Sequence, residues 1–272
     1  MQATEEDDNN LKKSQELANY KNMLISDTDI IASIHVECLT RPNSFPNPDH
    51  EDDKVSLIAT TFHTKKEGVQ TCIFKSVIKY DANIVGSPIF KMDNDITIES
   101  HDSEKDVIWS WIRLLEKLGT KLVIGWYIFN LDLLYLEKRA AKLGIGYFYE
   151  TRIGNIADRV KEDKFTPRKC YLVDKVNKIN KLDLMRYIEV KLHMFGPFAT
   201  VAKQLGLNVP ILESDKDKSF NVPVLKNDID KYTIDCCLTY LEMFYKIKVI
   251  DGLNELYKLT EQHFDLFKSR SK

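Results

Sequence analysis

The order of apolar and polar residues predicts strands in the first third of the chain and helices after it. Three apolar segments, DIIASIHVECL at 29–39, KVSLIATTFH at 54–63 and VQTCIFKSVI at 69–78, have the length and composition of β-strands. The turn-rich PNSFPNPDHEDD and the polar HTKKEG separate them. Three consecutive strands joined by short connections predict an antiparallel meander.

The pattern then changes to alternating helices and strands. HDSEKDVIWSWIRLLEKLGT, at 101–120, places apolar side chains at helical spacing after an Asp/Ser cap signal, and Gly119 ends the predicted helix. KLVIGW at 121–126 predicts a strand, and NLDLLYLEKRAAKLG at 130–144 predicts a helix. A strand running into a helix follows at 180–192, then a short helix at 197–208 and a long helix from near Asp228. The fold class is therefore α/β, with a mixed sheet flanked by helices.

The segment between Arg159 and Lys181 is basic, with eight Lys or Arg against three Asp or Glu. It predicts an inserted hairpin whose charges meet the phosphates of a single strand while its aromatic rings stack on bases. Arg168, Lys169 and Lys175 are its candidate nucleic-acid contacts. The alternative is a solvated hairpin that binds nothing.

Composition sets limits on the protein class. The chain has 272 residues, 43% of them hydrophobic, and a formal net charge of −2, so only local charge supports a nucleic-acid partner. No apolar run approaches the roughly 18 residues of a membrane span, and the acidic start, MQATEEDDNN, is unlike a signal peptide. Five cysteines without CxxC spacing argue against a disulfide framework and a structural zinc site. We expect a soluble intracellular protein that has no membrane partner.

Three parts follow from the composition along the chain. Residues 1–28 form a polar leader or the remnant of a preceding domain, residues 29–256 form the predicted domain, and residues 257–272 form the end of the last helix and a tail. We assign no function to the leader.

Polar side chains at a few positions are candidates for chemistry. Alternation along the first strand puts His35 and Glu37 on one face, as two ligands of one ion would require. Asp132 opens a predicted helix, and Tyr232 and Cys236 lie one turn apart on the last one. A structural interpretation is also open, in which Glu37 forms a strand-end salt bridge and Tyr232 packs on a helix face.

Taken together, these motifs resemble the 3′-to-5′ exonuclease domain of family B DNA polymerases. IHVECLTRPNSFPNPDHEDDKVSLIAT resembles the family's first motif, a strand with F-D-I-E followed by a loop with F-P-x-P. GWYIFNLDLLYLEKRA, at 125–140, resembles its second motif, and it is the most specific match. KLDLMRYIEVKL, VAKQLGL and DKYTIDCCLTYLEMF resemble the later Asp-bearing strand, a short helix and the Y-x-x-x-D helix. The resemblance implies a ribonuclease-H-like fold over roughly residues 29–256.

The resemblance also implies a site of four acidic residues and two metal ions, from which this chain departs. Glu37 and Asp132 stand at two of the acidic positions, but His35 and Cys236 replace the other two. Glu37 and Asp132 are therefore the candidate metal ligands, for Mg²⁺ or Mn²⁺ held weakly or for no ion, because imidazole and thiol are softer donors than carboxylate. A possible substitute carboxylate is Asp235, although one helical step turns it by about 100°. His35, Glu37 and Cys236 together could alternatively take a transition metal.

Other residues are assigned roles by the same resemblance. Tyr232 corresponds to the family residue that orients the attacking water, and Asn130 and Phe45 are candidate contacts to the strand. Trp126 and Tyr127 stand where the family has Tyr and Asn, which weakens the expectation of catalysis. For Asp183, capping of the helix that follows is favoured over a ligand role.

Three functions remain open at this point. The first is an exonuclease-like domain that binds single-stranded DNA or a replication partner, such as a polymerase subunit, with its 3′-to-5′ exonuclease chemistry lost or severely weakened. The second is an active proofreading exonuclease, part of a DNA polymerase, with a rearranged metal site. The third is a structural scaffold in a replication complex. Each implies location in the nucleus or at a viral replication site.

Overall fold

The computed structural model describes residues 26, 29–41, 44–66, 69–156, 172–173, 179–211, 226–252 and 255. Within them, eight strands form one sheet in the order β4-β5-β3-β2-β1-β6-β8-β7. The strands are β1 (Ile30–Cys38), β2 (Val55–Lys66), β3 (Val69–Tyr80), β4 (Ile89–Asp93), β5 (Ile96–His101), β6 (Thr120–Gly125), β7 (Leu172–Val173) and β8 (Asn180–Asp183). The described helices are α2 (Glu104–Lys117), α3 (Asp132–Lys142), α4 (Gly146–Arg152), α6 (Leu184–Leu192), α7 (Phe198–Gln204) and α8 (Lys226–Lys246).

The strand pairing confirms the predicted mixed sheet. β1 pairs antiparallel with β2, and β2 pairs antiparallel with β3, which is the expected meander. β6 then runs parallel to β1, and β8 runs parallel to β6. The carboxyl ends of these parallel strands meet at one edge, where helices and their connecting turns gather.

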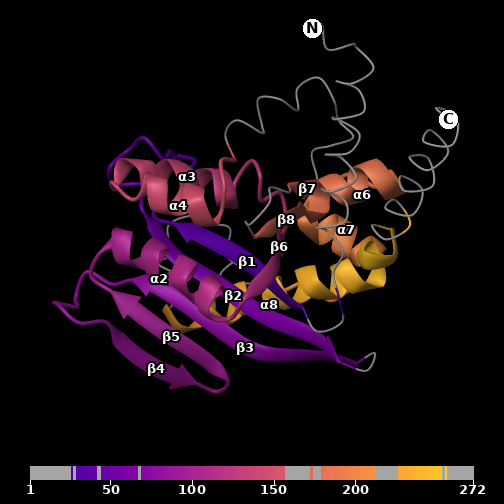
Figure 1. Ribbon diagram of the computed structural model, residues 1–272, viewed down its shortest axis with the longest axis horizontal. Helices are drawn as coiled ribbons and strands as arrows, with labels where there is room; N and C mark the ends of the chain where they lie inside the picture. Colours follow the sequence, from indigo (N-terminus) through magenta and orange to yellow (C-terminus); the bar gives the residue numbers. More distant parts are fainter. Residues whose placement is uncertain are drawn as a thin grey trace, which may run out of the picture.

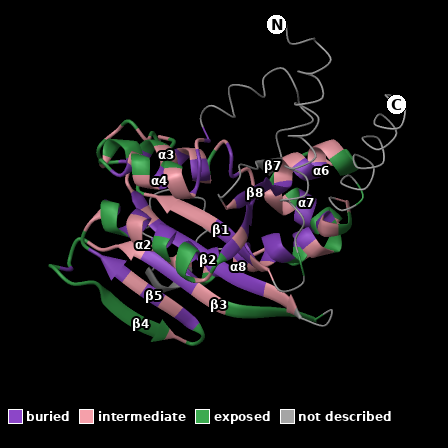
Figure 2. Cartoon of the chain, in the orientation of Figure 1, coloured by how far each residue is buried: buried purple, intermediate pink, exposed green. Residues whose placement is uncertain are grey.

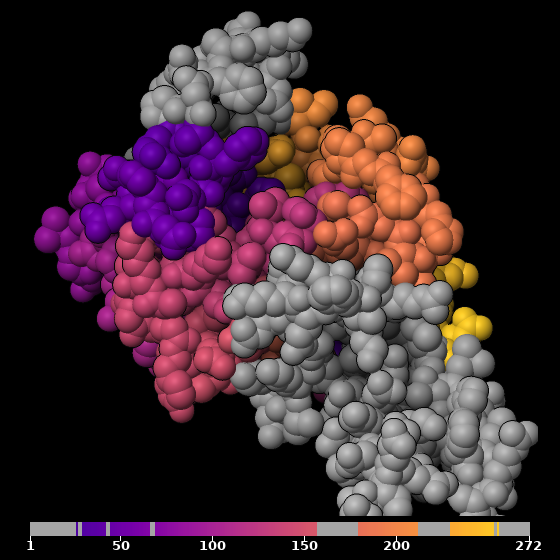
Figure 3. Space-filling view, turned by 90° about the horizontal axis from the view of Figure 1, so that it is seen from above, coloured from indigo at the N-terminus to yellow at the C-terminus, as the bar shows by residue number. Residues whose placement is uncertain are grey.

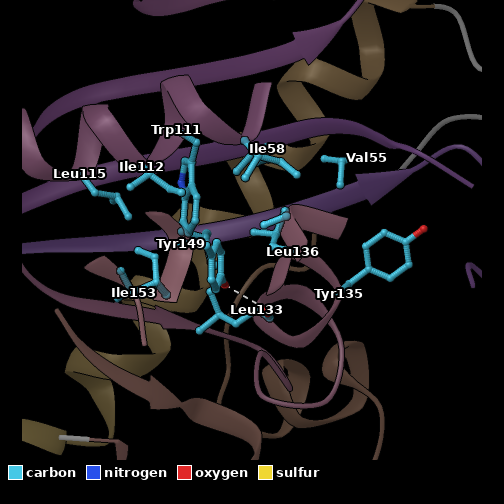
Figure 4. Packing of buried hydrophobic residues seen from close by; sticks show 14 of the residues in the cluster. Val55, Ile58, Trp111, Ile112, Leu115, Leu133, Tyr135, Leu136, Tyr149 and Ile153 are labelled. Carbon is cyan, nitrogen blue, oxygen red and sulfur yellow. Dashed lines mark hydrogen bonds between the residues drawn. The ribbon is translucent and has the colours of Figure 1, made fainter. Parts of the chain in front are cut away.

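Helices cover both faces of the sheet, with α2 in front and α8 behind in Figure 1. On the α2 side, Trp111 and Ile112 pack with Tyr149 and Leu136 in a fully buried cluster, which Figure 4 shows from close by. On the α8 side, Cys237 packs with apolar residues of β2, β3 and β5. The strands between the two layers are the most buried part of the molecule (Figure 2), which explains their nearly continuous apolar sequence.

Three details differ from the sequence prediction. The hairpin of β4 and β5 was not predicted, because β4 is an exposed edge strand without a buried face. Asn94, with a φ of 54°, forms its turn. The short helix α4 was also missed. The predicted long helix from near Asp228 is interrupted: α8 ends at Lys246, Lys248 adopts a left-handed φ of 51°, and helical structure resumes at residues 249–252. The predicted cap of α2 is confirmed, since the Ser103 side chain accepts a hydrogen bond from the Asp106 amide.

The leader, the tail and most of the basic hairpin lie outside the described residues. Of residues 159–181, the structure describes 172–173 and 179–181. Leu172 and Val173 pair antiparallel with β8. Among the described residues, no helix is both long enough and apolar enough to cross a membrane.

A loop of residues 39–54, here called the 39–54 loop, is tied to the helical layer by buried polar groups. Arg139 forms a two-pronged ion pair with Glu104. Nε of Arg139 donates to Oε1 at 2.7 Å, and Nη2 donates to Oε2. Its remaining nitrogen, Nη1, donates to the carbonyls of Pro48 and His50 at 3.0 and 2.8 Å. The Tyr135 hydroxyl donates to the Asp53 carbonyl at 2.6 Å. The conformation of this loop therefore depends on α2 and α3.

Candidate functional site

The candidate site lies where β1 ends beside the start of α3. His35 and Glu37 project from the same face of β1, as the alternation predicted, and Asp132 is the first residue of α3. Gly125, the last residue of β6, leaves no room for a side chain, since a Cβ there would lie 2.4 Å from Ile128 Cγ2. This close approach lets the chain turn from β6 directly into the segment that carries Asp132.

The His35 ring is held at both nitrogens. Its Nε2 lies 2.9 Å from Glu37 Oε1, and its Nδ1 lies 3.0 Å from the Tyr240 hydroxyl of α8. Because Glu37 only accepts, Nε2 carries a proton, and in the neutral ring Nδ1 accepts from Tyr240. Burial lowers the pKa of His35, but the hydrogen bond to Glu37 and the charges of Glu37 and Asp132 outweigh it, so the pKa is raised overall. The ring is thus held in place beside two carboxyl groups that favour its protonated form.

Helix α8 contributes three residues spaced four apart, Tyr232, Cys236 and Tyr240, on the face that packs against β1. The ring of Tyr232 meets that of His35 edge-on, with centroids 6.3 Å apart. Cys236 is 1% exposed, and burial raises the pKa of its thiol to about 12. A thiol that stays protonated is a poor metal ligand.

Asp235 points away from Cys236 on α8 and is partly buried. One helical step turns it about 100° from Cys236, and its neighbours on that side, Lys231 and Glu242, are exposed. Among the described residues, no metal-binding group of three or more His, Cys, Asp or Glu side chains includes Asp235.

Two aspartates, Asp132 in the site and Asp183 beside it, have raised pKa values. Burial raises the pKa of Asp132 to about 7; His35 opposes this effect, whereas the charges of Glu37 and Asp183 add to it. Burial raises the pKa of Asp183 to about 6, although its carboxylate accepts hydrogen bonds from three backbone amides, those of Tyr127, Phe129 and Arg186 at 3.1 to 3.2 Å. Asp183 caps α6, as predicted. Its hydrogen bonds to the backbone amides of Tyr127 and Phe129, in the turn before Asp132, were not predicted.

A pocket of about 510 Å³ opens beside these residues. The end of β1 forms one wall, the 39–54 loop a second, and the start of α3 a third; Figure 3 shows the indigo segment that contains this loop against the pink surface of α3 and α4. Phe45 and Asn130 line this pocket, and Phe45 is 93% exposed to solvent. The pocket thus brings together Glu37, Asp132, Asn130 and Phe45, all of which the sequence singled out.

The donor set does not fit the two-ion site that the resemblance implies. Glu37 Oε1 is already bonded to His35, and a pair of ions needs more oxygen ligands than two carboxylates supply. Within the described parts of the chain, no group of three or more His, Cys, Asp or Glu side chains could hold a metal ion. The predicted contacts Arg168, Lys169 and Lys175 fall outside the described residues.

Comparisons with known proteins agree with the motifs. Residues 4–194 match the family described as DNA polymerase family B, exonuclease domain. The chain is 27% identical over 186 residues to the DNA polymerase delta catalytic subunit of Candida albicans, a match that covers 65% of this chain and 17% of that protein. It is 32% identical over 139 residues to the corresponding subunit of Oryza sativa subsp. japonica, covering 51% and 12%.

The chain therefore spans less than a fifth of the length of these relatives. The family match covers most of the sheet and the strand and helix that carry Glu37 and Asp132, and the mixed sheet agrees with the ribonuclease-H-like fold. On these grounds the chain belongs to the exonuclease-domain family of the family B DNA polymerases.

Proposed function

We propose that this domain binds single-stranded DNA, within a replication assembly, in a pocket that has lost metal-dependent 3′-to-5′ cleavage. The observation that carries the proposal is the His35 network. At the position of a family carboxylate, the ring bonds to Glu37 on one side and to Tyr240 on the other. An imidazole in place of a carboxylate removes one negative charge from the site, and its hydrogen bond satisfies Glu37 without an ion.

The pocket supports binding of an unpaired strand. The exposed ring of Phe45 lines it, and aromatic rings stack on bases of any sequence. The exposed side chain of Leu131 adds apolar surface beside it. Lys138 lies on the rim and supplies a positive charge for a phosphate. The relatives named as DNA polymerase catalytic subunits support DNA as the ligand.

The alternative of a rearranged active site depends on Asp235. Its direction on α8 counts against that site. Reaching Glu37 would require the helix to rotate by about 100°, more than a quarter of a turn, and the buried Cys236 and Cys237 would leave the core. The scaffold alternative predicts that strands do not bind at all.

A restoration experiment tests the loss of cleavage. A 5′-labelled single-stranded oligonucleotide is incubated with wild type and with the double variant His35→Asp/Cys236→Asp, in Mg²⁺ and in Mn²⁺. We expect no ladder from wild type and a ladder from the double variant, because two oxygen ligands are returned to the site.

Adding Asp132→Ala to each protein separates the domain's own activity from contamination. A wild-type ladder that disappears in Asp132→Ala would refute the proposal and establish a live exonuclease. Circular dichroism of the double variant checks that an Asp at the buried position 236 leaves the fold intact.

A further inference from the structure

The acceptor groups of the pocket have few hydrogen-bond partners. Glu37 Oε1 accepts from His35, whereas its second oxygen, Oε2, accepts no hydrogen bond from the described residues. Within the same parts of the chain, neither carboxylate oxygen of Asp132 accepts one, and the side-chain amide of Asn130 forms none. All three residues line the same pocket. A ligand that fills it would therefore meet a floor of oxygen acceptors with one amide beside them.

The carboxyl groups of Glu37 and Asp132 decide which part of a nucleotide can lie against them in the pocket. A phosphate placed there would meet the negative charge of Glu37 and the partly ionised carboxyl group of Asp132, whose pKa is raised to about 7, with no metal ion between them. This arrangement is unfavourable. Lys138 on the rim is the nearest lining residue that attracts a phosphate. A nucleotide would then lie with its phosphate at the rim and its base pointing inward. The mostly apolar walls, formed by Val36, Leu131, Leu134 and Tyr135, suit a flat base.

The bases differ in what they offer to such a floor. Guanine alone carries two adjacent donors, N1–H and N2–H, on its Watson–Crick edge, and these match the fork of a carboxylate as an arginine does. Its O6 atom, on the same edge, can accept from the Asn130 amide. Cytosine and adenine each offer one exocyclic amine, and thymine offers a single N–H between two carbonyls. The carbonyls of thymine would face carboxylate oxygens.

Resting on the proposed function of strand binding, we propose that the pocket is a specificity site for an unpaired guanine, read by the carboxylate of Glu37 and the amide of Asn130. Such a preference would set the domain apart from surfaces that stack bases of any sequence. Phe45 stacks on the inserted base and contributes affinity for every base.

Fluorescence anisotropy with labelled thymidine 12-mers tests the proposal. Each strand carries one guanine, hypoxanthine, adenine or cytosine, at the 3′ end in one series and at the centre in another, at fixed salt and with EDTA present. We expect the dissociation constant to fall about tenfold with guanine, in at least one position, relative to thymine. Hypoxanthine, which lacks the N2 amine, should lose most of this gain.

Glu37→Gln supplies the decisive variant. The glutamine oxygen can still accept from His35, but its amide nitrogen then faces the pocket and offers donors to the donors of guanine. We expect the guanine preference to disappear while strands of thymidine alone still bind. Glu242→Gln, the same change at an exposed position of α8, should keep the preference.

The possible outcomes are distinguishable. Equal binding of all strands by wild type overturns the guanine site and leaves the proposed function standing. A guanine preference that survives in Glu37→Gln overturns the assignment of the base contact to Glu37. Failure of every strand to bind overturns the proposed function and the guanine site together.

Discussion

Replacement of Arg139 by leucine should destabilise the domain strongly, because it leaves a carboxylate buried without its counter-charge. Glu104 is 5% exposed and Arg139 is 2% exposed, so water can reach neither group freely. Glu104 Oε1 would keep only the hydrogen bond from the Val55 amide, at 2.9 Å. Removing one partner of a buried ion pair costs about 3–5 kcal/mol.

That cost is large beside the free energy of unfolding of a typical domain, about 5–15 kcal/mol. For a domain of this size, each kcal/mol shifts the melting temperature by about 2–4 °C. We therefore expect Arg139→Leu to melt about 6–20 °C below wild type, and its urea midpoint to fall with the slope unchanged. The carbonyls of Pro48 and His50 lose their donor as well, so binding of single strands in the pocket should weaken.

The double variant Arg139→Leu/Glu104→Leu separates the charge from the packing. It removes both charges, so it should recover part of the loss and cost about 1–3 kcal/mol, mainly for the Val55 amide that loses its acceptor. The neighbouring exposed Lys138→Leu serves as the matched control and should change stability by less than about 0.5 kcal/mol. An Arg139→Leu variant that loses less than about 1 kcal/mol, or a double variant as unstable as the sum of the single ones, would refute this reasoning.

Three further predictions rest on other contacts. Burial lowers the pKa of His63 to about 4, so only the unfolded state binds a proton between that pH and about 6.5; stability should fall by up to about 3 kcal/mol as pH drops through this window. Urea midpoints at pH 7 and pH 4.5 should show a smaller fall for His63→Gln than for wild type, and equal falls would contradict the assignment. Gly125→Ala should cost about 1–3 kcal/mol in urea unfolding, since its Cβ would overlap Ile128; a change below about 0.5 kcal/mol would argue against the close approach. Tyr240→Phe removes the hydroxyl at Nδ1 of His35 and should cost about 1 kcal/mol, together with a shift of the imidazole NMR signals; unchanged signals would count against this hydrogen bond.

Much of the fold could be predicted because its signals are local. The strands β1, β2 and β3 carry long apolar segments, and α2 and α3 carry helical spacing with end signals such as Gly119 and Gly144. The hairpin of β4 and β5 gave a weaker signal, because β4 has only five residues. Its Phe90 and Met92 alternate with polar residues, but both are exposed and bury no face of the strand. The end of α8 was missed because no glycine or proline marks the left-handed residue Lys248.

The candidate site could be predicted as a set of residues but not as a network. Spacing placed His35 and Glu37 on one face of a strand, and the motifs added Asp132, Asn130 and Phe45. The partner of His35 on α8, Tyr240, was not predicted, because the two residues lie 205 positions apart and no local pattern connects them. The motif included Arg139 but did not predict its partners, because its hydrogen bonds to Glu104 and to the Pro48 carbonyl form only when the helices and the loop pack together.

The position of α8 bears on where this domain can be cut. The family match ends at residue 194, yet α8, at residues 226–246, supplies the layer behind the sheet. Ser33 of β1 donates to the Cys237 carbonyl of α8 at 2.8 Å, and the apolar side chains of Ile31 and Leu57 are covered by the same helix. A fragment cut at residue 194 would expose this whole apolar face to water and favour aggregation. The smallest unit able to fold by itself therefore extends through α8, well past the boundary that sequence similarity draws.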